Sequence, residues 1–213
     1  MFKKVLSLCL VTLMTACLWV VPARAEEPPI TLTSEAALLM DADTGTIILE
    51  KNAHKGLPVA SVTKIMTLLL CMEALERGEI ALTDELVASQ SAAGMGGSQV
   101  LIETGGVYTV SDLLKAIIVA SANDASVLMA EALCGSEEAF VARMNQRAQE
   151  LGMENTHFEN ATGLSAPGHL CSAYDVAIMS RELLKHPIFF QYSSIWMDEI
   201  SHPNNRVTMI SNT

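Results

Sequence analysis

The chain has 213 residues, of which 50% are hydrophobic, so it is long enough to bury the core of one sizeable domain. Its formal net charge is −11, and removal of a leader that contains Lys3, Lys4 and Arg24 would make it more acidic still. Such an acidic surface argues against nucleic acid and against anionic lipid as direct partners.

The first 25 residues have the pattern of a secretory signal peptide. Two lysines form a positive start, an apolar run follows from Val5 to Val21, and Ala23–Ala25 offers the small residues that a signal peptidase needs. We therefore expect residues 1–25 to be cleaved and the mature chain to be secreted, that is, extracytoplasmic. Two alternatives stay open: an uncleaved anchor, and lipidation at a segment around Cys17 that faintly resembles a lipoprotein cleavage box.

Three cysteines follow the leader: Cys71, Cys134 and Cys171. Three cannot make a full disulfide framework, and Cys71 lies in an apolar helical pattern where a free cysteine is an ordinary core residue. The sequence contains no Cys-x-x-Cys pair and no His-Glu-x-x-His motif, and its five histidines are scattered. We therefore expect neither a metal site nor a cofactor.

The first predicted element is a β-hairpin. Residues 36–40 and 46–50 are short apolar segments, and the Asp-Ala-Asp-Thr-Gly stretch between them supplies turn residues and a glycine able to adopt positive φ. Because a two-stranded hairpin is not stable alone, we expect it to form the edge of a larger sheet. Few other strands are predicted.

Helices dominate the rest of the chain. A helix from about Ser61 to Arg77 is apolar nearly all round, which is typical of a helix in the middle of a domain. The other predicted helices are one capped by Thr109 or Ser111 that breaks at 121–123, one over 124–133, one from Ser136 to Gly152, and one opened by Ser172 with Asp175 that runs to about Lys185 before Pro187.

Candidate chemistry begins at Ser61 and Lys64. Side chains three residues apart meet on one face of a helix, so the hydroxyl and the amine should be in contact. Burial would lower the pKa of Lys64 and let it accept the proton of Ser61, which would then be an activated nucleophile. The alternative is a capping serine beside a lysine that extends toward solvent, since Ser-x-x-Lys occurs about once by chance in a chain of this length.

A second constellation, Ser121-Ala122-Asn123, lies at the break between two predicted helices. Such residues can simply satisfy loose helix ends, but the two motifs together in this order are a much sharper signal. We interpret His169 as packing within its loop. The glycine-rich segment Gly94–Gln99 either lines a cleft as a mobile loop or marks ordinary turns.

The segments "ASVTKIMT" and "SANDAS" resemble the active-site serine penicillin-recognising enzymes, whose motifs are Ser-x-x-Lys, Ser-x-Asn and Lys-Thr-Gly. More closely, the chain is similar to the secreted D-alanyl-D-alanine carboxypeptidases, the low-molecular-mass penicillin-binding proteins, from roughly Ala36 to Lys185, with a fainter echo in "RVTMISNT". The resemblance implies an α+β / α/β penicillin-binding (β-lactamase-like) serine transpeptidase fold, in which helices flank an antiparallel sheet and form a mostly helical subdomain. Residues 26–213 would be part of that peptidase domain, with the hairpin and a loop at 36–60 and the helical part at 61–185.

The resemblance also implies roles. Ser61 would attack the carbonyl between the two terminal D-alanines of a peptidoglycan stem peptide, with Lys64 as its base. Ser121 would relay a proton to the departing D-alanine, and Asn123 would hold Lys64 and a substrate amide. The backbone amide of Ser61 would supply half of an oxyanion hole. A β-lactam would leave Ser61 blocked.

One motif of the family, Lys-Thr-Gly, is absent from this sequence. We therefore expect the chain to be part of a longer protein that carries the remaining sheet strands, and we expect the 213 residues alone to be inactive. The family usually has a C-terminal amphipathic anchor, which implies peripheral membrane attachment through a segment beyond this chain. Two other functions stay open: a serine β-lactamase-like hydrolase, which would want Ser-Asp-Asn at 121–123, and a non-catalytic peptidoglycan-binding module.

Overall fold

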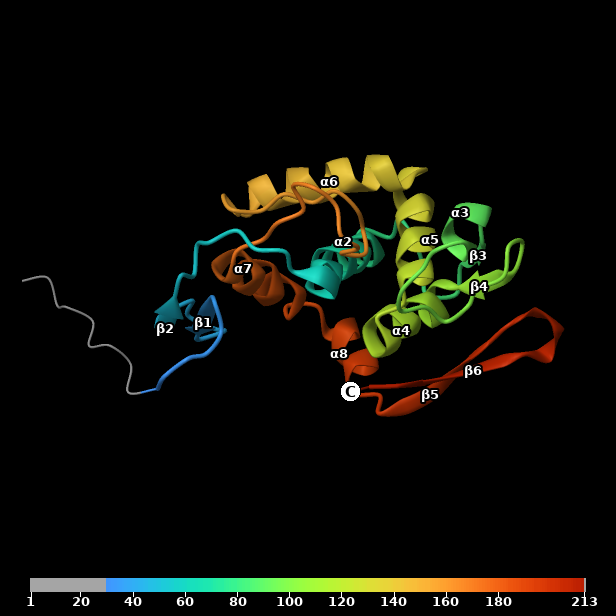
Figure 1. The fold of residues 1–213 in the computed structure, drawn as a ribbon. Coiled ribbons are helices and arrows are strands. Elements are labelled where there is room, and N and C mark those ends of the chain that lie inside the picture. The colour runs from blue at the N-terminus through green and yellow to red at the C-terminus, as the bar shows by residue number, and fades with distance from the viewer. Residues whose placement is uncertain (1–29, 213) are drawn as a thin grey trace, which may run out of the picture. The chain divides into compact units, whose positions relative to one another are not determined.

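The computed structural model describes residues 30–212, and the signal peptide predicted at 1–25 lies outside them. Residues from Ser34 onward form one compact unit. Its elements are β1 (Ala37–Met40), β2 (Ile47–Lys51), η1 (Ala60–Thr63), α2 (Lys64–Glu76), β3 (Glu85–Val87), α3 (Gln90–Ala93), β4 (Val107–Thr109), α4 (Val110–Ala120), α5 (Asn123–Cys134), α6 (Glu137–Glu150), α7 (Ala173–Leu183), α8 (Pro187–Ser193), β5 (Met197–Ser201), η2 (Pro203–Asn205) and β6 (Val207–Ser211) (Figure 1).

The hairpin predicted near the start of the unit is confirmed as β1–β2, an antiparallel pair in which Leu39 lies opposite Leu49. Its turn is held by the Asp41 carboxylate, which accepts hydrogen bonds from the backbone N–H and the hydroxyl of Thr44 at 2.7 and 2.6 Å. Gly45 takes the positive φ (+74°) that the turn needs. Within the described residues β1 and β2 pair only with each other, so the larger sheet expected around them is not seen there.

The prediction of few further strands is wrong. Two more antiparallel hairpins occur, β3–β4 and β5–β6, each a separate two-stranded sheet within the described residues. β3 and β4 have three residues each, which is too short for an alternating pattern to stand out. The short helix α8 was not predicted, because a proline after a helical pattern usually marks the end of a helix; here Pro187 occupies the first position of a new one, to which proline is well suited.

The predicted helix caps are confirmed at three positions. The Thr109 hydroxyl accepts the backbone N–H of Asp112 at the start of α4, so Thr109 and not Ser111 is the cap. Ser136 caps α6 and Ser172 caps α7 in the same way. Each cap satisfies a backbone donor that the first turn leaves unpaired, so these helices begin at fixed residues.

Helix α2 lies at the centre of the unit and contacts α4, α5, α6 and α7 (Figure 1). Leu68 and Met72 belong to a core shared with α4 and α5, whereas Met66 and Leu69 belong to a second core shared with α6 and α7. This confirms the central helix predicted from its all-round apolar sequence. Its beginning differs from the prediction: Ser61 lies in the 3-10 turn η1, and the α-helix starts at Lys64.

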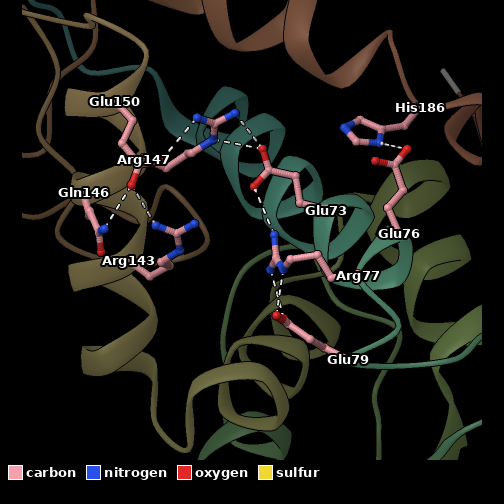
Figure 2. Close-up of polar contacts among 9 residues, drawn as sticks. All are labelled: Glu73, Glu76, Arg77, Glu79, Arg143, Gln146, Arg147, Glu150 and His186. Carbon is pink, nitrogen blue, oxygen red and sulfur yellow. Dashed lines mark hydrogen bonds and ion pairs between the residues drawn. The ribbon is translucent and has the colours of Figure 1, made fainter.

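The C-terminal half of α2 is fixed to its neighbours by ion pairs, shown in Figure 2. Arg147 of α6 binds the Glu73 carboxylate at 2.8 Å through two guanidinium nitrogens, and Arg77 lies 3.7 Å from the other oxygen. On another side, His186 contacts Glu76 at 2.7 Å just before α8. These contacts join α2 to α6 and to the α7–α8 connection, which keeps the helix that begins at Lys64 in place.

Replacing Glu73 by glutamine should lower the free energy of unfolding by about 1–2 kcal/mol, because Arg147 would lose a charged partner at a largely buried position. The Glu73 side chain is only 14% exposed. Glu79 also binds an arginine but is 53% exposed, so Glu79→Gln should cost less than about 0.5 kcal/mol. Urea unfolding of the two variants measures the difference, and equal costs would contradict a stabilising role of Glu73.

Candidate active site

The predicted nucleophile and base are brought together at the junction of η1 and α2. The amine Nζ of Lys64 lies 3.1 Å from Oγ of Ser61 and donates a second hydrogen bond to the carbonyl of Thr162 at 2.8 Å. Ser61 is exposed, whereas Lys64 is only 3% exposed. A reachable hydroxyl therefore contacts an amine that is withdrawn from water.

Burial sets the protonation of this amine. It disfavours the ammonium form and lowers the pKa of Lys64 from 10.5 to about 8. At pH 7 roughly one amine in ten is then neutral, against fewer than one in a thousand for an ordinary lysine. A neutral amine can keep its hydrogen bond to Thr162 and use its lone pair to accept the proton of Ser61.

A loop over residues 160–169, which we call the cradle loop, holds the η1–α2 junction from one side. Besides the Thr162 carbonyl that binds Lys64, the Ala161 carbonyl accepts the hydroxyl of Thr67 at 2.7 Å. Gly163 lies so close to the junction that a Cβ there would be 1.8 Å from the Ala60 carbonyl oxygen. The geometry of Ser61 and Lys64 therefore depends on a segment about one hundred residues away in sequence.

The strain at this junction is visible in the backbone. Ala60, directly before Ser61, has a φ of +44°, a conformation that an L-residue with a Cβ rarely adopts. Such a residue keeps its conformation only where the surroundings impose it. Gly163 packs against the Ala60 carbonyl at this point, so the cradle loop leaves Ala60 little room to relax.

A pocket of about 410 Å³ lies between the cradle loop and the residues before Ser61. It is lined by Pro58–Ala60 and Gly163–Leu170, most of which present apolar groups. The pocket is therefore next to the η1 turn, and Ser61 directly follows Ala60, one of its lining residues.

Ser121 and Asn123 lie at the junction of α4 and α5, as predicted. Ser121 ends α4 with a φ of +55°, and its hydroxyl has no hydrogen bond within the described residues. The amide nitrogen of the Asn123 side chain donates to the Gly96 carbonyl at 2.7 Å, which leaves Oδ1 buried without a partner in the same part of the structure. No hydrogen bond joins Asn123 to Lys64 among the residues described, although α2 and α5 pack together.

The glycine-rich segment Gly94–Gln99 wraps around Asn123. The backbone N–H of Asn123 donates to the Ser98 carbonyl at 2.7 Å, and a Cβ on Gly97 would be 2.7 Å from Nδ2 of Asn123. Glycine is required at position 97 because the chain passes this close and has a φ of +79°. The sequence suggested this segment only as a loop or a set of turns.

Sequence reasoning missed Asp124. Its carboxylate is fully buried and accepts the backbone N–H groups of Val100 and Ile102 at 3.1–3.2 Å. Asp124 thereby ties the α4–α5 junction to the chain that follows the glycine-rich segment. An aspartate directly after Ser-x-Asn at a helix start is the signal that could have identified it.

Neither a metal cluster nor a membrane-spanning helix is found in residues 30–212. No group of three or more histidine, cysteine, aspartate or glutamate side chains is placed to hold a metal ion in that range. In the same residues no helix combines the length and apolar character needed to cross a bilayer.

The chain is similar to proteins of one known family. The model of the D-alanyl-D-alanine carboxypeptidase family, Peptidase S11, matches residues 22–212. The chain belongs to this family. D-alanyl-D-alanine carboxypeptidase DacF of Bacillus subtilis is 47% identical over 180 residues, and DacC of Escherichia coli is 35% identical over 191 residues.

Solved structures of this family have the same fold. The crystal structures of D-alanyl-D-alanine carboxypeptidase DacD from Francisella tularensis and of penicillin binding protein 6B from Escherichia coli both match with a TM-score of 0.78 and 32% identity. The matches cover 80% and 86% of this chain, and 42% and 59% of those proteins. The predicted penicillin-binding serine transpeptidase fold is confirmed.

These relatives are longer than the chain. The match covers 84% of this chain for both DacF and DacC, but only 46% and 48% of those two proteins. The chain therefore spans about half the length of the curated relatives it matches. For this reason the activity and the substrate of the whole protein are proposals.

Proposed function

We propose that this chain supplies the nucleophile and base of a serine-type D-alanyl-D-alanine carboxypeptidase. The substrate is a peptidoglycan stem peptide that ends in D-Ala-D-Ala, and the reaction removes the last D-alanine through an acyl-enzyme. Family membership supports the reaction class. The contact between Ser61 Oγ and the buried amine of Lys64, at 3.1 Å, carries the proposal for the residues.

Acylation begins with the transfer of the Ser61 proton to the neutral amine of Lys64. Oγ then bonds to the carbonyl carbon between the two D-alanines, and the negative charge moves to the carbonyl oxygen. The backbone N–H of Ser61 belongs to the first turn of η1, where such groups lack partners within the helix, and in this proposal it stabilises the oxygen. The junction thus provides nucleophile, base and one oxyanion donor.

Expulsion of D-alanine needs a proton on its nitrogen. In this proposal Ser121, whose hydroxyl has no hydrogen bond within the described residues, relays the proton taken up by Lys64 to that nitrogen as the C–N bond breaks. The unpartnered Oδ1 of Asn123 accepts a hydrogen bond from an amide of the substrate. Its orientation is fixed because Nδ2 must donate to the Gly96 carbonyl. Water then attacks the acyl-enzyme and releases the shortened peptide.

We infer that the protein acts outside the cytoplasm, where its substrate is found, and that β-lactams acylate Ser61 in place of the stem peptide. The signal-peptide pattern at 1–25 supports this location. Peripheral membrane attachment through a segment beyond Thr213 stays a prediction from the family resemblance.

The test uses the full-length polypeptide that contains this chain. We expect it to release D-alanine from a diacylated peptide ending in D-Ala-D-Ala, and to form a covalent adduct with a fluorescent penicillin. Proteolysis and mass spectrometry should place the adduct on the peptide that contains Ser61. An adduct on another residue, or none, would refute the proposal for Ser61.

The same assays separate the other functions. A β-lactamase-like hydrolase would turn over the penicillin rapidly and would leave the D-Ala-D-Ala peptide intact. A non-catalytic peptidoglycan-binding module would bind the peptide without release of D-alanine and without any adduct. The proposal requires both slow release of the penicillin and turnover of the peptide.

A further inference from the structure

His169 lies at the end of the cradle loop and reaches the η1–α2 junction. Its Nε2 atom is 2.6 Å from the hydroxyl of Thr63, which directly precedes Lys64 in the chain. The histidine is 4% exposed and Thr63 is fully buried. The two side chains are 106 positions apart in sequence, so this contact joins the cradle loop directly to the Ser61–Lys64 turn.

The hydrogen bonds of His169 fix its tautomer. The backbone N–H of Glu159 donates to Nδ1 at 3.0 Å, so Nδ1 carries no proton. The proton of the neutral ring is therefore on Nε2, which donates to the Thr63 hydroxyl. Phe158 packs edge-on against the ring, with 5.8 Å between the centroids. Each ring nitrogen has one partner, and the ring has one orientation.

We propose that His169 is a positioning residue of the active site: through Thr63 it fixes the η1 turn so that Ser61 Oγ stays in contact with Lys64 Nζ. The inference rests on the proposed function of Ser61 and Lys64. The contact acts from the side opposite to solvent, because Thr63 is buried while Ser61 is exposed. It acts in concert with the Thr162 carbonyl, which holds Lys64 from the same loop.

Protonation of His169 breaks this arrangement. A proton on Nδ1 would face the N–H of Glu159, so two donors would meet and the ring would have to move. Burial lowers the pKa of His169, and of the charges around it the Glu159 carboxylate raises that pKa while His157 lowers it. Glu159 and His157 also pair with each other at 3.1 Å, and Lys64 is the charged neighbour on the α2 side of Thr63. His169 is therefore neutral at pH 7, and the positioning contact is lost in acid.

Three substitutions in the full-length polypeptide test this inference. His169→Ala should lower the rate of acylation of Ser61 by penicillin about 10- to 100-fold, because the reacting atoms lose their alignment. His169→Gln keeps one donor and one acceptor and should restore most of the rate. Thr63→Val removes the other partner and should behave like His169→Ala, and the double variant should be no worse than either alone.

The pH profile provides a readout that a purely structural role would not move. In the unsubstituted protein the logarithm of the acylation rate should fall with a slope of about one below the pKa of Lys64, and more steeply once His169 is also protonated. Glutamine does not titrate, so the His169→Gln variant should keep the slope of about one throughout. A steep acid limb that persists in His169→Gln would overturn the inference.

The outcomes also separate this inference from the proposed function. If the unsubstituted protein does not react at Ser61, the proposed function fails. If it reacts and His169→Ala reacts at the same rate, only the role of His169 fails. Should His169→Ala not fold, the comparison of Thr63→Val with Thr63→Ser decides, because serine keeps the hydroxyl that His169 binds and should keep the rate.

Discussion

Lys64→Met is expected to lower the rate at which penicillin acylates Ser61 by about 10²- to 10⁴-fold, the usual contribution of a positioned general base. Methionine has a similar length and is apolar, so it suits a site that is only 3% exposed, and the effect can be attributed to the lost amine. Ser61→Ala, which should give no adduct at all, defines the background of the assay. Circular dichroism and thermal unfolding of both variants check that they fold.

The pH dependence of the unsubstituted protein is set by the same amine. Because burial lowers the pKa of Lys64 to about 8, the neutral base is depleted below that pH and abundant above it. The acylation rate should therefore rise about tenfold per pH unit up to pH 8 and then level off. In Lys64→Met this rise of the acylation rate with pH should be absent. A rate independent of pH between 6 and 8 in the unsubstituted protein would argue that Lys64 is not the base.

Local patterns in the sequence were enough to predict which two side chains meet at the junction of η1 and α2. The spacing of Ser61 and Lys64 predicted their contact, and it holds at 3.1 Å although a 3-10 turn replaces the first turn of the expected α-helix. A 3-10 turn also places side chains three residues apart on one side, which explains why the two side chains are in contact although the turn is not α-helical. Cap residues such as Thr109 and Ser136 could also be predicted from the local sequence, because a cap acts on backbone groups only three or four residues away.

Contacts between distant segments could not be predicted in this way. The Thr162 carbonyl binds Lys64 across 98 positions, and nothing in either local sequence indicates the other. The buried carboxylate of Asp124 and the unpartnered Oδ1 of Asn123 also acquire their meaning only in the folded chain. The lower pKa of Lys64 is different, because its direction was predicted from burial and burial is its cause.

Gly163→Ala is expected to have the largest effect on stability, a loss of at least about 3 kcal/mol in the free energy of unfolding. Gly163 has a φ of +84°, where any Cβ costs about 1–2 kcal/mol. In addition, the new Cβ would lie 1.8 Å from the Ala60 carbonyl oxygen, so backbone must move rather than a side chain. That movement displaces the residue directly before Ser61, and acylation should fall together with stability.

Gly152 provides a matched control for the clash. Its φ is +71°, close to that of Gly163, but a Cβ there would meet nothing within 4 Å. Gly152→Ala should therefore cost only about 1 kcal/mol and leave acylation unchanged, since it lies just beyond the end of α6. Urea unfolding of both variants isolates the contribution of close packing from that of backbone conformation. Equal costs would show that the cradle loop does not press on Ala60, and the positive φ of Ala60 would then need another cause.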